Sequence, residues 1–195
     1  MTKDKILEAA IHQYSLHNYH GATMQKIAKE VGIKPASIYF FYKNKESLFV
    51  AAFQKLLEDH FKRMQSILEE VHEKPILDIF ATLIKGTVEY HKNNMNETNA
   101  YISLVTSPPA EIKKFLHDHM NKFDKWMIDS LHHLIKRDHP KISDEEAVNL
   151  TRKFILLLDG IFWEINLYDD DELSVQIEQA VHILEVLLGG NYNAK

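Results

Sequence analysis

Residues 23–49 read TMQKIAKEVGIKPASIYFFYKNKESLF, and this stretch decides the fold. Its first apolar residues recur at the spacing of one helix face: Met24, Ile27, Ala28 and Val31. Thr23 is suited to cap the start of that helix, and Gly32 can adopt the left-handed backbone that ends it. Pro35 favours the first turn of a next helix, which we expect to run to about Tyr42. Two short helices joined by a glycine-containing turn are the layout of a helix-turn-helix.

The segments on either side also show the helical period, and none shows sustained alternation, so we predict an all-α chain of about nine helices. One helix precedes the quoted stretch, with an apolar stripe from Ile6 to Tyr14 that ends near Asn18. Asn44 can cap a fourth helix whose stripe reaches Val71. This fourth helix is long enough to join two domains.

Prolines and capping signals divide the rest of the chain. We expect breaks near residues 93–96 and 108–109, followed by a long helix to about residue 136. Ser143 with Glu146 forms a capping box that opens a helix through residue 167. We expect three acidic residues, 169–171, to interrupt the pattern before a last helix, whose apolar face runs from 173 to 188 and which stops at residues 189 and 190.

The composition, 45% apolar and 26% charged over 195 residues, is that of an ordinary globular protein. There is no cysteine, which excludes disulfides, thiolate nucleophiles and cysteine-ligated zinc. The N-terminus lacks the layout of a signal peptide. The longest apolar stretch, residues 154–165, contains Asp159 and Glu164 and is shorter than the roughly 20 residues of a membrane span. We therefore expect a cytoplasmic protein with no membrane segment.

The net charge of −5 would by itself argue against a nucleic-acid partner. The charge is unevenly distributed, however. Residues 1–48 hold seven lysines and four acidic residues, a charge of +3, so residues 49–195 carry −8. The basic end of the chain is therefore the end that holds the predicted helix-turn-helix.

The region from Lys5 to Phe53, about a quarter of the chain, resembles the DNA-binding domain of TetR family transcriptional regulators. The resemblance rests on residue types at fixed spacing: Tyr14, Gly21, Thr23, Ile27, Ala28, Val31, Gly32, Ile38, Tyr39, Lys45, Glu46 and Leu48. It implies a DNA-binding domain at residues 1–48 and a helical ligand-binding and dimerisation domain at residues 49–195. It also implies a homodimer that binds a pseudopalindromic double-stranded operator, usually as a repressor.

The DNA-contacting positions of this family fall on nine residues: Thr23, Lys34, Pro35, Ala36, Ser37, Tyr39, Phe40, Phe41 and Lys45. By their chemistry, Thr23, Tyr39 and Lys45 suit phosphate contacts. Lys34 and Ser37 suit contacts with base edges.

We expect different environments for two aromatic residues of this region, Phe41 and Tyr42. Phe41 departs from the family, which commonly has a polar aromatic residue at this position. Its phenyl ring cannot donate to a phosphate, so we expect either no contact there or apolar packing on sugar or a thymine methyl group. Tyr42, by contrast, is expected to face the core.

Residues from about 50 onward contain no nucleotide-binding, zinc-protease or serine-hydrolase pattern, so we expect no enzyme, no catalytic residue and no cofactor. Twelve histidines raise the question of a metal site, but no two of them have the i, i+4 spacing that converges on an ion. Surface histidines on amphipathic helices explain them better, and no metal is predicted.

The helices expected at residues 145–167 and 173–188 are apolar over wider faces than one small domain needs to bury. The resemblance implies that these last two helices of each subunit form a four-helix dimer interface. Gly160 would allow close helix approach there, although a purely internal core stays open. Asp159 is expected at the edge of its helix, because a buried carboxylate needs a partner.

Eight bulky residues are candidates for the walls of an effector pocket: Tyr90, Met95, Tyr101, Phe123, Trp126, Met127, Phe162 and Trp163. Large, adaptable side chains between helices suit a small-molecule effector, but each of them is also consistent with plain core packing.

Together these features predict a sequence-specific DNA-binding transcriptional regulator, a homodimeric repressor that a small-molecule effector releases from its operator. We expect the effector to favour a dimer whose recognition helices no longer match major grooves about 34 Å apart. An activator or a constitutive architectural DNA-binding protein stays open, as does the alternative of a helical carrier or interaction module without regulatory DNA binding.

Overall fold

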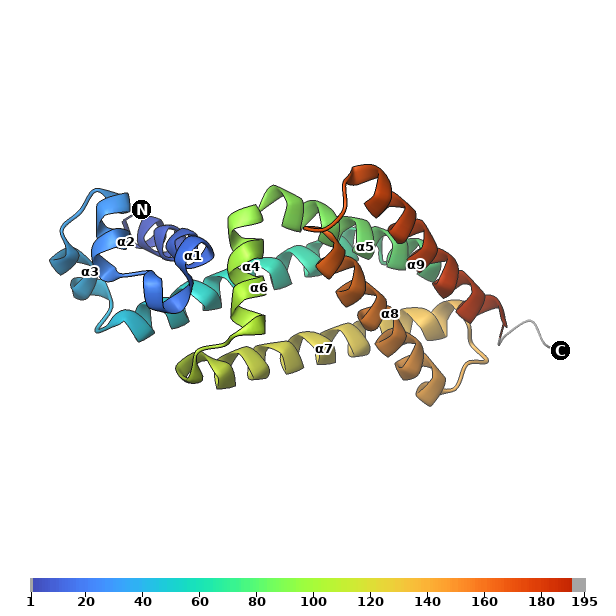
Figure 1. The fold of residues 1–195 in the computed structure, drawn as a ribbon. Helices are drawn as coiled ribbons and strands as arrows, with labels where there is room; N and C mark the ends of the chain where they lie inside the picture. Colours follow the sequence, from blue (N-terminus) through green and yellow to red (C-terminus); the bar gives the residue numbers. More distant parts are fainter. Residues whose placement is uncertain (1, 191–195) are drawn as a thin grey trace. The chain divides into compact units, whose positions relative to one another are not determined.

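The computed structural model describes residues 2–190, and these residues fold into helices and turns without a strand (Figure 1). The nine helices of this range are α1 (Thr2–Gly21), α2 (Met24–Val31), α3 (Pro35–Phe41), α4 (Lys45–Val71), α5 (Ile76–Asn93), α6 (Met95–Thr106), α7 (Ala110–Asp138), α8 (Asp144–Glu164) and α9 (Asp170–Gly190). The predicted all-α class is confirmed. The outer limits of the two predicted domains, residues 1 and 195, lie outside the described residues.

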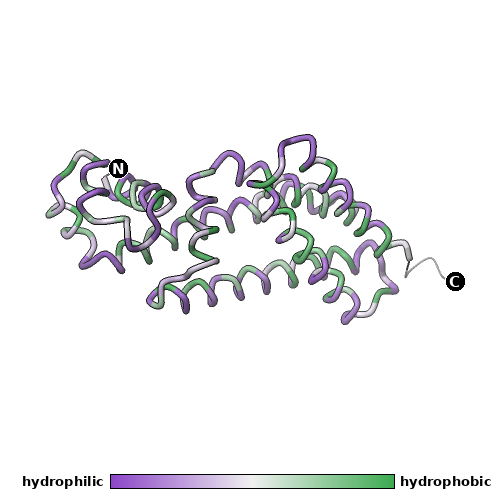
Figure 2. The backbone as a smooth tube through the Cα atoms, viewed as in Figure 1, coloured by the Kyte–Doolittle hydropathy of each residue, from purple (hydrophilic) through white to green (hydrophobic). Residues whose placement is uncertain are grey.

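The long helices are amphipathic, as α7 illustrates. Hydrophobic and hydrophilic residues alternate along it from turn to turn in Figure 2. Its buried apolar residues recur three or four positions apart over most of its length: Ile112, Leu116, Phe123, Met127, Leu131 and Ile135. This spacing keeps one stripe of the helix away from water, and that burial stabilises the helix.

The chain divides into two compact units. Unit 1 extends through Phe61 and also includes Asn93–His119, whereas unit 2 consists of Lys62–Lys92 and the chain from Met120 onward. Unit 1 therefore holds α1–α3, the first part of α4, α6 and the first part of α7. The division of function at residue 48 stays a prediction, since the compact units follow packing rather than sequence order.

The core of unit 1 is built around the ring of Tyr14 on α1. This ring lies 4.8 Å from the ring of Phe53, nearly perpendicular to it, and 5.6 Å from the ring of Phe49. Burial raises the pKa of Tyr14, and a side-chain hydrogen bond with Ser103 of α6 acts in the opposite direction. Tyr14 therefore connects α1 with both α4 and α6.

In unit 2, α4 and α5 approach closely at Gly86. A Cβ atom at this position would lie 2.4 Å from Cδ1 of Ile67, so any larger residue would force Ile67 to move. On the same helix the ring of Phe80 stacks on that of Phe154 of α8, with the ring centres 4.6 Å apart. These contacts place the core of unit 2 between α4, α5 and α8.

The helix ends follow the sequence signals with two exceptions. Ser143 and Glu146 form the predicted capping box, in which the Ser143 hydroxyl accepts from the Glu146 N–H at 3.2 Å. However, α8 ends at Glu164, three residues before the predicted end. The expected break before the last helix is present, but only Asp169 of the acidic run lies in it: the Asp169 carboxylate accepts the N–H groups of Asp171 and Glu172, and α9 begins at Asp170.

Candidate nucleic-acid interface

The caps of α2 set the geometry of the turn that follows it. The Thr23 hydroxyl accepts the N–H of Lys26 at 3.2 Å, which confirms Thr23 as the N-cap. At the other end Gly32 has a φ of 76°, the left-handed conformation that glycine adopts without strain. The N–H of Ile33 then reaches back to the Ala28 carbonyl at 2.9 Å. This pattern ends α2 and turns the chain sharply toward α3.

The inner side of α3 is held by a single fully buried side chain. Pro35 occupies the first turn, as predicted, after Lys34 in extended backbone. Ile38 has no exposed surface, and neither have Ile27 and Ala28 of α2. The short helix is therefore positioned by apolar packing on one side, while its other sides are left to solvent.

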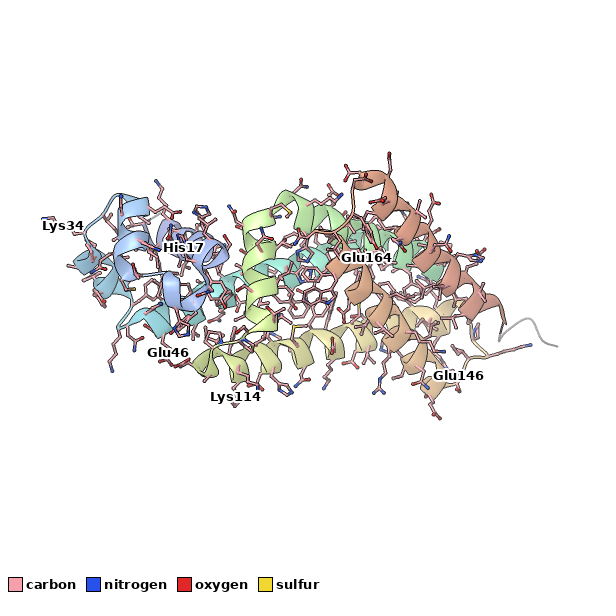
Figure 3. All side chains as sticks on the ribbon, viewed as in Figure 1. His17, Lys34, Glu46, Lys114, Glu146 and Glu164 are labelled. Atoms are coloured by element: carbon pink, nitrogen blue, oxygen red, sulfur yellow. The ribbon has the colours of Figure 1, made fainter. Side chains whose placement is uncertain are left out.

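Seven of the nine predicted DNA-contacting residues are exposed on α3 or directly before it: Lys34 at its N-cap, and Pro35, Ala36, Ser37, Tyr39, Phe40 and Phe41 on the helix. The side chain of Lys34 projects away from unit 1 in Figure 3. The remaining two, Thr23 and Lys45, are partly exposed and stand at the starts of α2 and α4. Seven of the nine residues thus gather on or directly before one short helix, and the other two stand at the starts of the helices that precede and follow it.

Three of the four consecutive aromatic residues from Tyr39 to Tyr42 face solvent. Tyr39 is 52% exposed, Phe40 84% and Phe41 41%, whereas Tyr42 is buried, as predicted. The rings of Phe40 and Phe41 meet edge to face, with their centres 5.2 Å apart. The Tyr42 hydroxyl is buried without a hydrogen-bond partner among the described residues, and burial raises the pKa of this group.

Two lysines of the module bind the end of α1, where the last carbonyl groups of a helix lack intrahelical partners. Lys26 Nζ donates to the Gly21 carbonyl at 3.0 Å. Lys45 Nζ donates to the Tyr19 carbonyl and, at 3.5 Å, to that of His20. The Lys45 ammonium also lies 4.5 Å from the centre of the Tyr19 ring, and partial burial lowers its pKa.

These lysine contacts were not anticipated from the sequence. The sequence assigned Lys45 to a phosphate contact and Lys26 to no specific role, and only the folded chain brings both to the end of α1. A basic residue beside the C-terminal end of a helix is a known stabilising arrangement. The carbonyl that Lys45 binds, however, belongs to Tyr19, 26 residues earlier in the chain. No local sequence pattern indicates a contact over that separation.

The eight candidate pocket residues are distributed over both units. Met95 and Tyr101 lie on α6 in unit 1, and the other six lie on α5, α7 and α8 in unit 2. Phe123, Met127 and Phe162 are buried, whereas Trp163 is 41% exposed. Their roles as pocket walls stay a prediction.

His91, a buried residue of α5 in unit 2, was not among the residues predicted from the sequence. Its ring centre lies 5.3 Å from that of Tyr90 and 4.7 Å from that of Phe162, so it connects α5 with α8. The signal was available, because His91 continues the apolar stripe of α5 that includes Ile84 and Val88.

Two open hollows in unit 2 are lined by none of the eight candidates. One, of about 680 Å³, lies beside Pro75, Arg137 and Glu185, and the other, of about 490 Å³, beside Asp124 and Arg152. Among the described residues, no three histidine or acidic side chains are grouped closely enough to hold a metal ion. Across residues 2–190, no helix combines the length and apolar character required to cross a membrane.

Comparison with known proteins agrees with this geometry. Residues 6–52 match the family described as bacterial regulatory proteins, tetR family. The biofilm operon icaADBC negative transcriptional regulator IcaR of Staphylococcus epidermidis is 28% identical over 155 residues, which are 78% of this chain and 80% of that protein. The fatty acid metabolism regulator protein of Bacillus subtilis is 30% identical over 66 residues, 34% of each chain.

Solved structures of regulators share the fold over nearly the whole chain. A TetR transcription regulator from Haloarcula marismortui has a TM-score of 0.72 at 21% identity and covers 97% of both chains. The fatty acid degradation regulator FadR from Bacillus halodurans has a TM-score of 0.71 at 17% identity, covering 96% of this chain and 98% of that one. The match at residues 6–52 shows that this chain carries the helix-turn-helix domain of the TetR family of transcriptional regulators, and its similarity to regulators of the same fold extends over most of its length.

Proposed function

We propose that the protein is a homodimeric repressor that binds a pseudopalindromic operator through α3 and leaves it when a small-molecule effector binds. The observation that carries this proposal is the solvent-facing surface of α3, six exposed residues on a helix that is anchored by the buried Ile38, with exposed Lys34 directly before them. Repression is supported by the Staphylococcus epidermidis relative, whose name describes a negative transcriptional regulator.

Thr23 and Lys45 can each serve a phosphate while keeping the contacts they make within the chain. A hydroxyl that accepts a hydrogen bond still has its own hydrogen to donate, so Thr23 can cap α2 and donate to a phosphate oxygen. An ammonium has three hydrogens, and Lys45 uses two on the carbonyls of α1. The third is left for DNA. Both residues contribute affinity without reading sequence.

Lys34 and Ser37 are the polar residues that we assign to base edges. Both are exposed at the start of α3, the end of a recognition helix that meets base edges in a major groove. A lysine favours the acceptor atoms of guanine, whereas a serine hydroxyl accepts several bases.

The dimer would form through an exposed face of the last two helices. We call this face the outer stripe: Leu156, Asp159, Gly160 and Trp163 of α8, with Val175, Ile183 and Val186 of α9. Leu156 is 72% exposed, and the three α9 residues are about half exposed. Exposed apolar side chains of this kind suit an interaction site, because burying them against a partner removes them from water.

Gly160 gives independent support for a partner at the outer stripe. A Cβ atom at this position would meet no heavy atom within 4 Å, so packing within the chain does not require glycine here. Because glycine has no side chain, a helix of a second copy that crosses α8 at Gly160 could approach the backbone more closely than it could at any other residue. Asp159 lies on the exposed side of α8, as expected.

For an effector to control DNA binding, the helices that contact it must be coupled structurally to α3. Within unit 1, α6 carries the candidate pocket residues Met95 and Tyr101 and packs against α1 through Tyr14 and Ser103. An effector that displaces α6 would therefore act on α1, and through it on the module. A hundredfold loss of DNA affinity needs only about 2.7 kcal/mol of differential binding.

A mobility-shift titration of the full chain tests this proposal. The probe is the DNA upstream of the gene for this protein, and the control is a scrambled duplex of equal length and composition. We expect a shift that is selective for the upstream DNA and weakens steeply with salt. Equal shifts of both duplexes, or none, would contradict the proposal.

A further inference from the structure

The most exposed large apolar side chain among the described residues is Phe40, with 84% of its surface in solvent. Successive residues of a helix are rotated by about 100°, so Ala36 and Phe40 both lie about 160° from the buried Ile38. They are therefore the two side chains of α3 that point farthest from the core. A helix that enters a major groove presents this side to the base edges.

The ring of Phe40 is supported on one side. Its centre lies 5.2 Å from that of Phe41 at an interplanar angle of 89°, the edge-to-face arrangement that aromatic rings favour. Ala36, one turn earlier, is too small to shield it. The protein thus holds a phenyl ring in water, on the surface that we assign to DNA, at a position where burial would release free energy.

The major groove offers such a ring one apolar partner. Adenine, guanine and cytosine present hydrogen-bonding atoms there, whereas thymine adds the C5-methyl group. A phenyl ring placed over polar base atoms would remove water from them without replacing its hydrogen bonds, which is unfavourable. Contact with methyl groups instead buries apolar surface on both sides.

We propose that Phe40 reads thymine methyl groups, so that each operator half-site carries thymine where Phe40 meets the base edges. This inference rests on the proposed DNA binding through α3. Phe40, supported by Phe41, would then be an apolar base-contacting residue beside the polar residues Lys34 and Ser37. The operator would contain thymine at the position that Phe40 contacts.

Replacing thymine by uracil tests the proposal, because uracil keeps the base pair and loses only the C5-methyl group. An operator is first selected from random duplexes with the full chain, and each thymine is then replaced singly. We expect about fourfold weaker binding at one or more positions of each half-site, the change that corresponds to about 0.8 kcal/mol for one buried methyl group. Fluorescence anisotropy at fixed salt measures the affinities.

The variant Phe40→Ala connects the methyl effect to this residue. We expect it to bind the thymine and uracil operators equally, whereas the control Leu16→Ala, at another exposed apolar residue of unit 1, keeps the difference. If Phe40→Ala binds too weakly to titrate, Phe40→Leu replaces it, and we expect an altered uracil penalty.

Three results would overturn the proposal: no position sensitive to uracil, an undiminished penalty in Phe40→Ala, or an unchanged one in Phe40→Leu. Failure to select any operator is a different outcome. It would contradict DNA recognition itself rather than the reading of methyl groups.

Discussion

The side-chain ammonium of Lys45, in the first turn of α4, donates a hydrogen bond to the main-chain carbonyl of Tyr19 near the end of α1. A residue that the family pattern assigns to DNA therefore also fastens two helices of the module. Its removal would act on the fold and on DNA affinity together, and the two effects can be measured separately.

We expect Lys45→Ala to lower the free energy of unfolding by about 1–2 kcal/mol, because hydrogen bonds to two carbonyls of α1 are lost. Lys43→Ala removes an exposed lysine two residues away and should change stability by less than about 0.5 kcal/mol. Urea unfolding measures both. Lys45→Ala should also weaken binding to all DNA sequences alike; unchanged stability would show that the contacts with α1 carry no weight.

Lys34→Ala and Ser37→Ala should change which sequences the protein prefers, because these exposed residues are assigned to base edges. Selection from random duplexes, carried out in parallel with the wild-type chain, compares the preferred sites. A Lys34→Ala protein with wild-type affinity and wild-type preference would remove Lys34 from base reading.

Tyr42→Phe should stabilise the protein by about 1 kcal/mol. The Tyr42 hydroxyl is buried without a hydrogen-bond partner among the described residues, and an unsatisfied buried polar group costs free energy that phenylalanine avoids. Tyr39→Phe, at an exposed tyrosine of α3, is the matched control and should leave the unfolding midpoint unchanged. A less stable Tyr42→Phe protein would mean that this hydroxyl has a partner in solution.

Asp159 gives a prediction about pH. The residue keeps surface in solvent, but protein atoms crowd its carboxyl group, and this burial, with a smaller effect from Asp124, raises its pKa to about 6. The folded chain therefore favours the protonated form. The contribution of Asp159 to the free energy of unfolding therefore falls as the pH rises from 3.8, the ordinary pKa of an aspartate, to about 6, its pKa in the folded chain. Above pH 6 this contribution stays low.

Asp159→Asn should accordingly be more stable than the wild type at pH 7.5 and equally stable at pH 4. Asp129→Asn, the same substitution at an exposed residue of α7, is the control. Urea midpoints at the two pH values decide the matter. Equal midpoints of Asp159→Asn and wild type at pH 7.5 would contradict the crowding of this carboxyl.

Leu156→Lys should convert the proposed dimer into monomers, because it places a charge in the outer stripe. Leu16→Lys introduces the same charge at an exposed leucine of α1 and should leave the dimer intact. Sedimentation equilibrium measures the mass of each. A dimeric Leu156→Lys protein would show that subunits associate through another surface.

Much of the fold could be predicted because its signals are local. Thr23 caps α2, Gly32 adopts a positive φ and Ser143 opens α8, and each depends on neighbours within a few residues. The same holds for the inward side of Tyr42, which follows from the position of Ile38 one turn earlier.

The features that sequence reasoning missed depend on distant segments or on competing signals. The partner of Lys45 lies on another helix, and α6 joins α1–α3 in unit 1 through packing that no local pattern encodes. All three residues of the acidic run 169–171 were expected to lie in a break before the last helix, whereas Asp170 and Asp171 belong to the first turn of α9. The first member of the run, Asp169, caps the helix, and acidic residues are favourable in a first turn.

Selection from a random duplex pool at two salt concentrations, with the full chain, tests the central claim most directly. We predict enrichment of one pseudopalindromic sequence whose half-sites lie about 34 Å apart, with an affinity that falls as salt rises. A pool that remains random after selection, at either salt concentration, would contradict the assignment of α3 to sequence-specific DNA recognition.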